Sequence, residues 1–416
     1  MNIVLSVLGT YGDVLPFLAI GRQLAQRGHD VSLYAPEPFR QPALRSGLGF
    51  DAMCTEAEYD EALSSPNLWH PRRGLAPLFD MMASLAGRTM QWLLDRTSEN
   101  SCLVIASPNA FGARLAQDKG GVPVITIHVT PFLIESRNAA PWLPGVPLQG
   151  LMPSRLRHWL GRGADRVLID PVSLPPLNDL RVSLGLSPVK RLRYWWNSPL
   201  RIILMCPPWY VPPQPDWPRQ LIQVGFPMAD RLGDVGELTP TLEAYLDAGP
   251  APLVFTYGSG MREGAQFFRV AVEICRRMRR RGILLAHEAE QVPDSFPADV
   301  IHVRYAPLSL LLPRSAALIH HGGIGTVAQA LAAGVPQMVV PVAFNHFDDA
   351  QRLSRLGLGA VLRRQAFRPR HACREIERML ASPAMVDART TARRRMTADD
   401  GVASACDEIE RVAGTL

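Results

Sequence analysis

A glycine-rich turn in the second half of the sequence has the composition of a site for an anionic ligand. The apolar run 317–320 is typical of a strand, and the segment 326–333 is typical of a helix. Between strand and helix, the small residues are Gly322, Gly323, Gly325 and Thr326. Glycines at such a turn let the backbone approach a ligand, and the amides of the helix start face it with the positive end of the helix dipole. We predict a cradle for a diphosphate, with a purely structural tight turn as the alternative.

The residues around this turn narrow what it could bind. No Gly-Lys pair followed by Ser or Thr is present, which excludes a Walker loop, and the glycines lack the spacing of the dinucleotide fingerprint. His320 ends the strand just before the turn. A lone histidine at that place is more often structural, so its role depends on the motif around it.

A second turn, close to the N-terminus, carries a carboxylate. Residues 9–16 follow the strand-like run 3–7 and lead into a helix that we expect over 16–27, with Pro16 in its first turn. Asp13 lies three residues before this proline. It could accept a proton from an attacking hydroxyl, or it could simply cap the helix. The residues alone favour the cap.

Both turns lie in a sequence that alternates between strand-like and helix-like segments, which is typical of parallel βαβ units. The strand candidates of the first half are 3–7, 31–35, 103–106 and 124–128, and those of the second half are 253–257, 283–286, 300–304, 317–320 and 337–341. At 416 residues the chain is too long for one ordinary domain. We therefore expect two doubly wound α/β domains that face each other across a cleft, with ligands at the carboxyl ends of the strands.

A proline-rich stretch lies between the two halves. Residues 206–218 contain six prolines, which exclude a regular helix or a central strand and suit a stiff connection between domains. We place the boundary near residue 230, with domains 1–230 and 231–416 and a last helix that could cross back to the first domain.

Composition narrows the class of protein. A hydrophobic content of 47% with 20% charged residues is globular, and no run of about 18 uncharged apolar residues predicts a membrane span. The first residues are strand-like, so we expect no signal peptide. The six cysteines are scattered without metal-binding or paired spacing, which favours a reducing, cytoplasmic location.

The net charge of +6 is modest, and its densest run is the arginine-rich segment 276–281. Cations suit a helix end, so a solvated helix terminus is the first interpretation and contact with an anionic membrane is the second. Nucleic acid is not expected as a partner, because no aromatic residues interleave with the arginines.

The order and spacing of residues 305–350 resemble the donor-binding signature of the nucleotide-sugar glycosyltransferases of GT-B fold. This family includes plant, sterol and antibiotic glycosyltransferases. The matching positions are Tyr305-Ala306-Pro307, the run from His320 to Thr326, Gly334-Val335-Pro336, Pro341 and Asp349-Ala350. The resemblance implies a GT-B fold, with acceptor binding by the first domain and nucleotide-sugar binding by the second.

The resemblance also implies roles for single residues. Tyr305 matches the aromatic residue that stacks on the nucleobase, and His320 matches the histidine that contacts the diphosphate. The remaining positions implied to bind the donor are Gly258, Ser259, Gly322, Gly323, Gly325, Thr326, Asn345, His346 and Asp349. Asn345 and His346 depart from the usual Asp-Gln pair that holds the sugar hydroxyls, so the recognised hydroxyl pattern could differ.

In bacterial relatives, the segment that matches 9–16 carries the general base, which implies this role for Asp13. Its carboxylate would take the proton of the acceptor hydroxyl while the oxygen attacks the anomeric carbon from the face opposite the leaving nucleotide. This single displacement inverts the anomeric centre and needs one base, no metal ion and no cofactor beyond the nucleotide sugar.

Further segments resemble a narrower group, the rhamnosyltransferases that make rhamnolipid biosurfactants. They are 12–17, 68–71, 189–191, 212–218, 225–227, 252–256, 305–308 and 322–325. This resemblance implies transfer of L-rhamnose from dTDP-L-rhamnose to a 3-(3-hydroxyalkanoyloxy)alkanoate lipid, giving a mono-rhamnolipid at the cytoplasmic membrane face. Ala328 gives weak support to a thymidine donor, because plant relatives have there a glutamate that binds both ribose hydroxyls.

An apolar acceptor would need an apolar groove, for which the stretch 68–94 is the main candidate. Our acceptor-binding candidates are Trp69, Phe79, Met82, His128 and Phe132. Methionines adapt to flexible apolar ligands, yet the core faces of two helices explain this stretch equally well. His128 at a strand end is more often a core histidine than a ligand.

Three other functions stay open at this stage. One is a glycosyltransferase that uses a UDP-hexose and acts on a lipid, sterol or polyketide. Another is a non-catalytic relative that only binds nucleotide, which the pair Asn345 and His346 keeps open. The third is an epimerase of the same fold, which the turn around Asp13 disfavours because it suggests activation of a hydroxyl.

Overall fold

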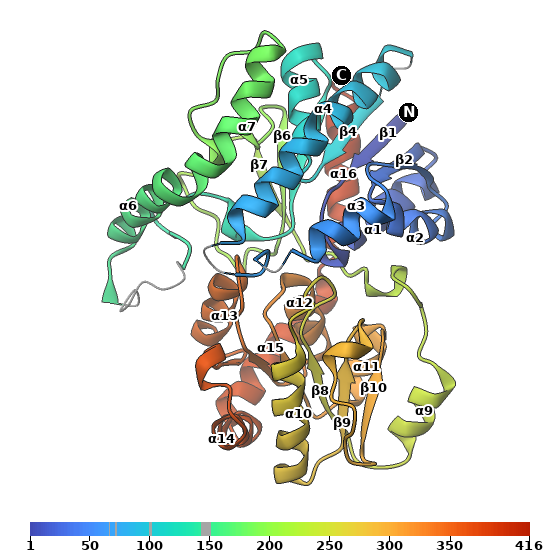
Figure 1. The fold of residues 1–416 in the computed structure, drawn as a ribbon, viewed down its shortest axis with the longest axis vertical. Coiled ribbons are helices and arrows are strands. Elements are labelled where there is room, and N and C mark those ends of the chain that lie inside the picture. Colours follow the sequence, from blue (N-terminus) through green and yellow to red (C-terminus); the bar gives the residue numbers. More distant parts are fainter. Residues whose placement is uncertain (66, 71–72, 100–101, 143–150) are drawn as a thin grey trace. The chain divides into compact units, whose positions relative to one another are not determined.

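The computed structural model describes residues 1–65, 67–70, 73–99, 102–142 and 151–416, which form two α/β units (Figure 1). Unit 1 comprises Met1–Pro227 and Asp400–Leu416, and unit 2 comprises Met228–Asp399. Each unit has its own parallel sheet. The predicted α/β class, with two Rossmann-like parallel-sheet domains, is confirmed.

The sheet of unit 1 has the strand order β3-β2-β1-β4-β5-β6-β7. Its strands are β1 (Asn2–Ser6), β2 (Asp30–Ala35), β3 (Gly49–Ala52), β4 (Cys102–Ala106), β5 (Val124–His128), β6 (Arg201–Met205) and β7 (Leu221–Val224). All neighbours pair in parallel, and β1 lies between β2 and β4. The strand order reverses at β1 and β4, which is where open α/β sheets bind ligands.

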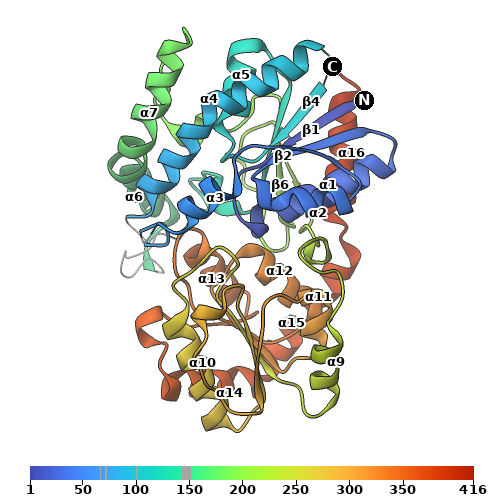
Figure 2. The same cartoon turned by 45° about the vertical axis from the view of Figure 1, so that its right-hand side comes forward.

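Helices cover both faces of this sheet (Figure 2). They are α1 (Tyr11–Gln26), α2 (Arg40–Arg45), α3 (Glu56–Leu63), α4 (Leu75–Glu99), α5 (Phe111–Gly120), α6 (Ser154–Ala164), α7 (Asp170–Ser183), α8 (Leu192–Trp195) and α16 (Gly401–Ala413). Helix α5 approaches α4 closely, since a Cβ on Gly112 would lie 2.4 Å from Cβ of Thr89. Glycine at this crossing therefore sets the helix spacing.

Helix α1 begins at Tyr11, five residues before the start that we predicted at Pro16. The reason is a capping box, in which Thr10 is the N-cap and Asp13 the third helical residue. This box fixes the helix start upstream, so the proline lies inside the helix and removes one backbone hydrogen bond there.

The proline-rich stretch 206–218 does not connect the two units. It lies between β6 and β7, both of which belong to unit 1, and Tyr210 and Val211 within it are buried. A proline-rich segment can connect two neighbouring parallel strands of one sheet as well as two domains. Its composition alone does not distinguish these two kinds of connection.

Unit 2 has the strand order β10-β9-β8-β11-β12-β13, again with parallel neighbours. The strands are β8 (Leu253–Thr256), β9 (Gly282–Leu285), β10 (Val300–Val303), β11 (Ala317–His320), β12 (Gln337–Val339) and β13 (Ala360–Val361). The helices are α9 (Pro240–Asp247), α10 (Ala265–Met278), α11 (Leu308–Leu311), α12 (Ile324–Ala333), α13 (His346–Arg355), α14 (Pro369–Leu380) and α15 (Pro383–Ala398).

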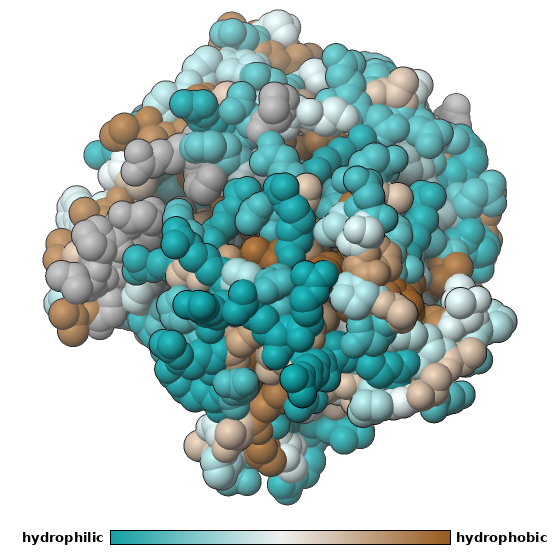
Figure 3. Space-filling view, turned by 60° about the horizontal axis from the view of Figure 1, so that its bottom comes forward, coloured by the Kyte–Doolittle hydropathy of each residue, from teal (hydrophilic) through white to brown (hydrophobic). Residues whose placement is uncertain are grey.

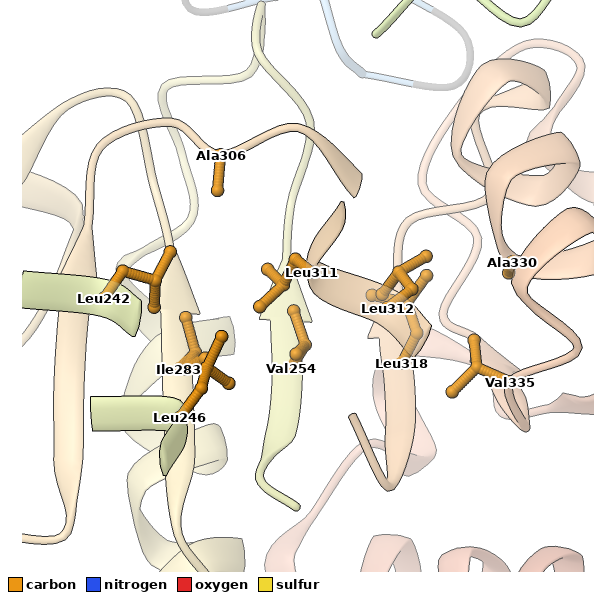
Figure 4. Packing of buried hydrophobic residues seen from close by; sticks show 10 residues of the cluster. All are labelled: Leu242, Leu246, Val254, Ile283, Ala306, Leu311, Leu312, Leu318, Ala330 and Val335. Atoms are coloured by element: carbon orange, nitrogen blue, oxygen red, sulfur yellow. The ribbon is translucent and has the colours of Figure 1, made fainter. Parts of the chain in front are cut away.

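The core of unit 2 holds these strands and helices in place. Figure 4 shows two pairs of neighbours in this core: Val254 of β8 lies next to Leu311, and Leu318 of β11 lies next to Leu312. Ala330 of α12 belongs to the same cluster. The neighbouring Phe255 packs edge-to-face on Phe267 of α10, 6.4 Å away. Because successive strand residues point to opposite faces, both faces of β8 are covered and the strand is fixed in position.

The arginine run 276–281 lies at the end of α10. Arg276 and Arg277 pair with Glu273 one turn earlier, at 3.1 and 2.7 Å. Arg279 ends the helix in the left-handed conformation, with φ of 49°. These contacts fit the interpretation as a solvated helix end. The face drawn in Figure 3 is mostly hydrophilic, with hydrophobic residues in small groups, and none of the described helices has the length and apolarity to cross a membrane.

Candidate functional site

The glycine-rich turn of unit 2 lies where the order of its strands reverses. Strands β8 and β11 are neighbours there, and Ile319 pairs with Phe255. Gly258 follows the carboxyl end of β8, and His321 follows the carboxyl end of β11. The topology therefore brings the two turns that we predicted from separate parts of the sequence to one edge of the sheet.

At three positions in these turns, the backbone conformation or the packing of neighbouring side chains requires glycine. Gly258 and Gly322 have φ of +94° and +103°, which residues with a side chain rarely adopt. A Cβ on Gly322 would also lie 2.8 Å from Val339 Cγ1, and one on Gly323 would lie 2.5 Å from Nε2 of His321. Larger residues would push His321 and Val339 out of position.

Gly325 differs from these three glycines. It is exposed in the first turn of α12, and a Cβ on it would meet no other atom of the protein within 4 Å. Glycine inside a helix costs about 0.5 to 1 kcal/mol relative to alanine. Neither backbone conformation nor packing within unit 2 requires this glycine, and the space beside it is open to a ligand.

The start of α12 offers hydrogen-bond donors to such a ligand. Its N-cap is Gly323, no side chain among the described residues caps the helix, and its first turn contains no acidic residue. The first amides of a helix have no acceptor within the helix and carry the positive end of its dipole. The geometry is that of an anion site formed by backbone amides.

His320 stabilises the turn from inside the protein. It is fully buried, its Nδ1 accepts a hydrogen bond from the Gly322 amide at 3.2 Å, and its Nε2 lies 3.1 Å from Oε1 of Gln337. Burial lowers the pKa of His320 to about 4, so the ring is neutral and Nε2 donates to Gln337. Both nitrogens are used in this arrangement, which does not favour the predicted contact of His320 with a diphosphate.

His321 has a different environment, which our reading of the sequence overlooked. Its ring lies against both glycine turns, within 3.1 Å of a Cβ placed on Gly258 and 2.5 Å of one on Gly323. Desolvation and the nearby His346 and His320 hold the pKa of His321 well below its usual value. The ring also makes a hydrogen bond to the backbone of Thr256, which raises the pKa of His321 and only partly offsets these effects. The sequence signal was its position directly before Gly322.

Asn345 and His346 lie beside the same turn. The rings of His346 and His321 are 4.9 Å apart, and a Cβ on Gly322 would lie 3.3 Å from Cβ of His346. Nδ1 of His346 accepts from the Ala343 amide at 3.2 Å, and burial lowers its pKa to about 3. Asn345 is partly exposed and donates from Nδ2 to Oδ2 of the buried Asp349 at 2.8 Å.

The backbone just before this pair is strained. Phe344 has φ of 49°, one of two positive values among the described non-glycine residues. Positive φ in a bulky residue persists only where the surroundings enforce it, and such strain gathers at ligand sites. Phe344 lies two residues before His346, which borders the glycine turn.

Tyr305 is anchored to the first residues of unit 2. Its hydroxyl donates to the Asp230 carbonyl at 2.5 Å, and a Cβ on Gly233 would clash with the same hydroxyl. The Asp230 carboxylate in turn accepts from the Ser309 amide at 2.7 Å and from Gln329 of α12 at 2.8 Å. The ring, only partly exposed, is thereby held in one orientation, and desolvation raises the pKa of Tyr305.

In unit 1, Asp13 follows β1 at the reversal of the strand order. Its Oδ2 accepts from the Thr10 amide at 2.8 Å and from the Thr10 hydroxyl at 3.4 Å, which completes the capping box. Gly9 provides the space, because a Cβ there would lie 2.3 Å from the same oxygen. Asp13 thus takes part in capping α1 as its third residue, with Thr10 as the N-cap, and does not cap a helix that begins at Pro16 as the residues alone suggested.

The cap does not prevent a second role for this carboxylate. Both hydrogen bonds go to Oδ2, and Oδ1 has no hydrogen-bond partner among the described residues. Desolvation, partly offset by the bonds from Thr10, raises the pKa of Asp13 from 3.8 to about 6. A partly exposed carboxylate with this pKa is a better base than an ordinary aspartate and is still ionised near neutral pH.

The five acceptor candidates of unit 1 lie in different environments. Phe79 and Met82 are buried in the core, and Phe79 stacks on Phe111 of α5 at 6.4 Å. His128 is fully buried with Nε2 at 2.7 Å from Asn197, and burial lowers its pKa to about 4. Trp69 and Phe132 are partly exposed. These positions fit a packing role for the first three and leave Trp69 and Phe132 accessible to a ligand.

Within the described residues, no three His, Cys, Asp or Glu side chains are grouped in a way that could hold a metal ion. The six cysteines are all free.

Comparison with known proteins matches both halves of the chain. The model of the glycosyltransferase family 28 N-terminal domain matches residues 3–136. The model of the erythromycin biosynthesis protein CIII-like C-terminal domain matches residues 281–410. The O-mycaminosyltylonolide 6-deoxyallosyltransferase of Streptomyces fradiae is 31% identical over 440 residues, which covers 100% of this chain and 98% of the relative.

Solved structures share the fold over nearly the whole chain. The glycosyltransferase of kitacinnamycin has a TM-score of 0.76 at 18% identity, covering 99% of this chain and 98% of that chain. The spinosyn rhamnosyltransferase, solved as a complex with thymidine diphosphate, has a TM-score of 0.69 at 18% identity, covering 99% and 100%. At this level of identity the two similarities concern the fold.

Proposed function

The chain belongs to the GT-B family of nucleotide-sugar glycosyltransferases, and from this premise we propose an inverting transfer of L-rhamnose from dTDP-L-rhamnose to a lipid hydroxyl. The acceptor in this proposal is a 3-(3-hydroxyalkanoyloxy)alkanoate and the product a mono-rhamnolipid. The enzyme would work in the cytoplasm, in peripheral contact with the inner membrane. The observation that carries the donor half is the uncapped start of α12 with the unexplained glycine at 325.

Several observations support a thymidine nucleotide with a 6-deoxy sugar. The relative of 31% identity is a 6-deoxyallosyltransferase, and L-rhamnose is also a 6-deoxyhexose. The spinosyn rhamnosyltransferase was solved with thymidine diphosphate. Ala328 is buried in α12 and offers no carboxylate for a ribose 2′-hydroxyl, which a thymidine nucleotide lacks.

In the proposed reaction, the turn of unit 2 stabilises the leaving nucleotide. The amides at the start of α12 would bind the diphosphate, and the ring of His321, which lies against both glycine turns, would contact it. Asn345 would bind sugar hydroxyls, and Tyr305 would stack on the base. As the bond from the anomeric carbon to the diphosphate oxygen breaks, negative charge grows on that oxygen, and these fixed donors stabilise it.

Asp13 would serve the other end of the reaction. The acceptor oxygen attacks the anomeric carbon and forms the new glycosidic bond, and Oδ1 of Asp13 takes the hydroxyl proton. The capping bonds to Oδ2 keep the carboxylate in one rotamer, and the raised pKa increases its affinity for the proton. Attack opposite the leaving diphosphate inverts the anomeric configuration.

A second acceptor class has its own support. The relative of 31% identity is named for transfer to O-mycaminosyltylonolide, so a polyketide aglycone, and likewise a sterol, is the alternative to a hydroxyacyl lipid. A UDP-hexose is the alternative donor. A protein that binds nucleotide without catalysis is the third possibility, because His346 stands where relatives usually have a sugar-binding glutamine.

The test uses the purified full chain with each donor and acceptor class in turn. Two donors, dTDP-L-rhamnose and UDP-glucose, are each paired with a hydroxyalkanoyloxy-alkanoate, a macrolide aglycone and a sterol. Products are identified by mass spectrometry and the anomeric configuration by NMR. We expect rhamnosyl transfer to the hydroxyacyl lipid with inversion. Turnover with UDP-glucose alone, or nucleotide binding without any product, would overturn the proposal.

A further inference from the structure

Helix α6 and the π-helical turn after it (Asp165–Ile169) have their hydrophobic side outward. Leu156, Trp159, Leu160, Val167 and Leu168 are 47, 72, 40, 72 and 45% exposed. We call these five residues the α6 apolar face. Leu156, Trp159, Leu160 and Val167 recur at helical spacing, so they lie on one side of the helix, and Leu168 is exposed beside them in the π-helical turn. In Figures 1 and 2, α6 lies at the outer edge of unit 1.

The opposite side of the helix is polar and buried. Arg157, His158 and Asp165 are each less than 10% exposed. A surface helix of a soluble domain normally buries its apolar stripe and exposes its polar one. In this helix the usual arrangement is reversed, because the apolar side faces outward and the polar side faces unit 1. The exposed side therefore has the composition of an interaction surface.

A network of buried ion pairs prevents the helix from turning. Asp165 accepts two hydrogen bonds from Arg193, at 2.9 and 3.0 Å, and one from Arg191 at 3.0 Å. Arg191 also pairs with Glu135 at 3.4 Å, and Glu135 lies 3.6 Å from Nδ1 of His158. Rotating the helix to bury its apolar side would leave these charges unpaired, which is strongly unfavourable. The exposure is thus built into the fold.

Cations line one side of the α6 apolar face. The side chains of Arg155, Arg162 and Arg166 make no hydrogen bond or ion pair with any residue the structure describes, and Arg155 and Arg166 are exposed. The single acidic residue between 151 and 168 is Asp165, which is buried and neutralised. A partner would thus meet an apolar strip with an exposed tryptophan and a positive border.

We propose that the α6 apolar face docks unit 1 on an anionic lipid bilayer. Tryptophan and leucine side chains enter the interface between headgroups and acyl chains, and flanking arginines bind anionic headgroups. A second copy of the chain is disfavoured as the occupant, because a symmetric contact would bring the same three arginines together. This inference deepens the membrane contact of the proposed function, and it requires neither the donor nor the reaction.

The experiment measures partition of the full chain onto vesicles. Vesicles of phosphatidylcholine alone are compared with vesicles that also contain phosphatidylglycerol, by sedimentation at low and high salt. We expect binding to the anionic vesicles that weakens with salt. The double variant Trp159→Ser/Leu160→Ser should lower the partition coefficient about tenfold or more. Arg155→Gln/Arg166→Gln should lower it about 25-fold, roughly fivefold for each charge.

Matched controls come from other exposed positions of unit 1. Leu44→Ser changes a leucine of α2 that is 50% exposed, and Arg219→Gln removes an exposed arginine outside α6. Both should partition like the parent. A third variant, Arg280→Gln, tests the arginine run at the end of α10, and an effect there without one at α6 would overturn the assignment.

Other occupants give distinct results. A dimer by size-exclusion chromatography that Trp159→Ser/Leu160→Ser dissociates, with no vesicle binding, would assign the face to a second copy and refute the lipid proposal. Absence of binding to anionic vesicles refutes it as well. Sugar transfer to a short-chain soluble acceptor is measured on the same proteins. Loss of vesicle binding with unchanged transfer separates this inference from the proposed function.

Discussion

Replacement of Gly325 by alanine should stabilise unit 2 and weaken donor binding at the same time. The new Cβ would meet no protein atom within 4 Å, so the substitution causes no clash in the free protein. Alanine in place of a helical glycine contributes about 0.5 to 1 kcal/mol. For a unit of this size, that corresponds to a rise in Tm of about 1 to 4 °C.

The same methyl group would occupy the space that we assign to the diphosphate. If it displaces one hydrogen bond between the ligand and an amide at the start of α12, the loss is about 1.5 to 3 kcal/mol. The affinity for thymidine diphosphate would then fall roughly 10- to 150-fold. Opposite signs for stability and affinity distinguish this variant from a merely destabilised protein.

Titration calorimetry with thymidine diphosphate and thermal unfolding measure the two quantities on the same protein. Gly163→Ala is the matched control, because Gly163 is an exposed glycine of α6 with equally open surroundings. It should bind thymidine diphosphate like the parent. If Gly325→Ala binds the nucleotide with unchanged affinity, the start of α12 is not the diphosphate site, and the argument from the unexplained glycine fails.

Four further variants test other parts of the structure. Asp13→Asn should retain nucleotide binding and lower the transfer rate by about 10²- to 10⁴-fold, and parental activity would leave Asp13 only its capping role. Because the pKa of Asp13 is raised to about 6, kcat/KM should rise up to that pH and then level off. Since folding raises this pKa, the protonated Asp13 stabilises the folded state. This stabilisation is complete below pH 3.8 and is lost as the pH rises through 6. The free energy of unfolding should therefore fall over this pH range in the parent, and Asp13→Asn should remove that pH dependence. His321→Ala should weaken thymidine diphosphate binding about tenfold, whereas His320→Ala should mainly lower Tm. If calorimetry shows weaker binding for His320→Ala and not for His321→Ala, His320 is the residue that contacts the ligand. Gly112→Ala should destabilise unit 1 by about 1 to 3 kcal/mol in urea unfolding, since its Cβ would lie 2.4 Å from Thr89, and an unchanged midpoint would contradict this packing.

The two adjacent histidines show how far the sequence could predict the site. The strand, the glycines and the helix after them were readable, because periodicity and turn chemistry are local properties. Which histidine faces a ligand depends on the residue at which β11 ends, since neighbouring side chains of a strand point to opposite faces. A one-residue uncertainty in that boundary exchanges the roles of His320 and His321.

Non-local contacts decided the other differences. The helix start at Tyr11 depends on the bond from Asp13 back to Thr10, and the proline-rich stretch belongs to unit 1 because β7 pairs with β6. We did not predict β6 and β7 as strands, since we interpreted the prolines between them as a domain boundary. The polar buried side of α6 was equally unreadable, because its partners Glu135, Arg191 and Arg193 are distant in sequence.

The chain leaves unit 1 at Pro227 and returns to it at Asp400, which constrains how the protein is made. A Cβ on Gly401 would lie 2.1 Å from the Gly225 carbonyl, Cys406 contacts the Ile20 carbonyl, and Arg27 pairs with Asp407 and Glu410. During synthesis, all of unit 2 leaves the ribosome before the helix that covers α1. Unit 2 can therefore complete its fold first, while unit 1 waits with an open apolar seam, and a nascent chain that stalls before residue 400 would present that seam to chaperones.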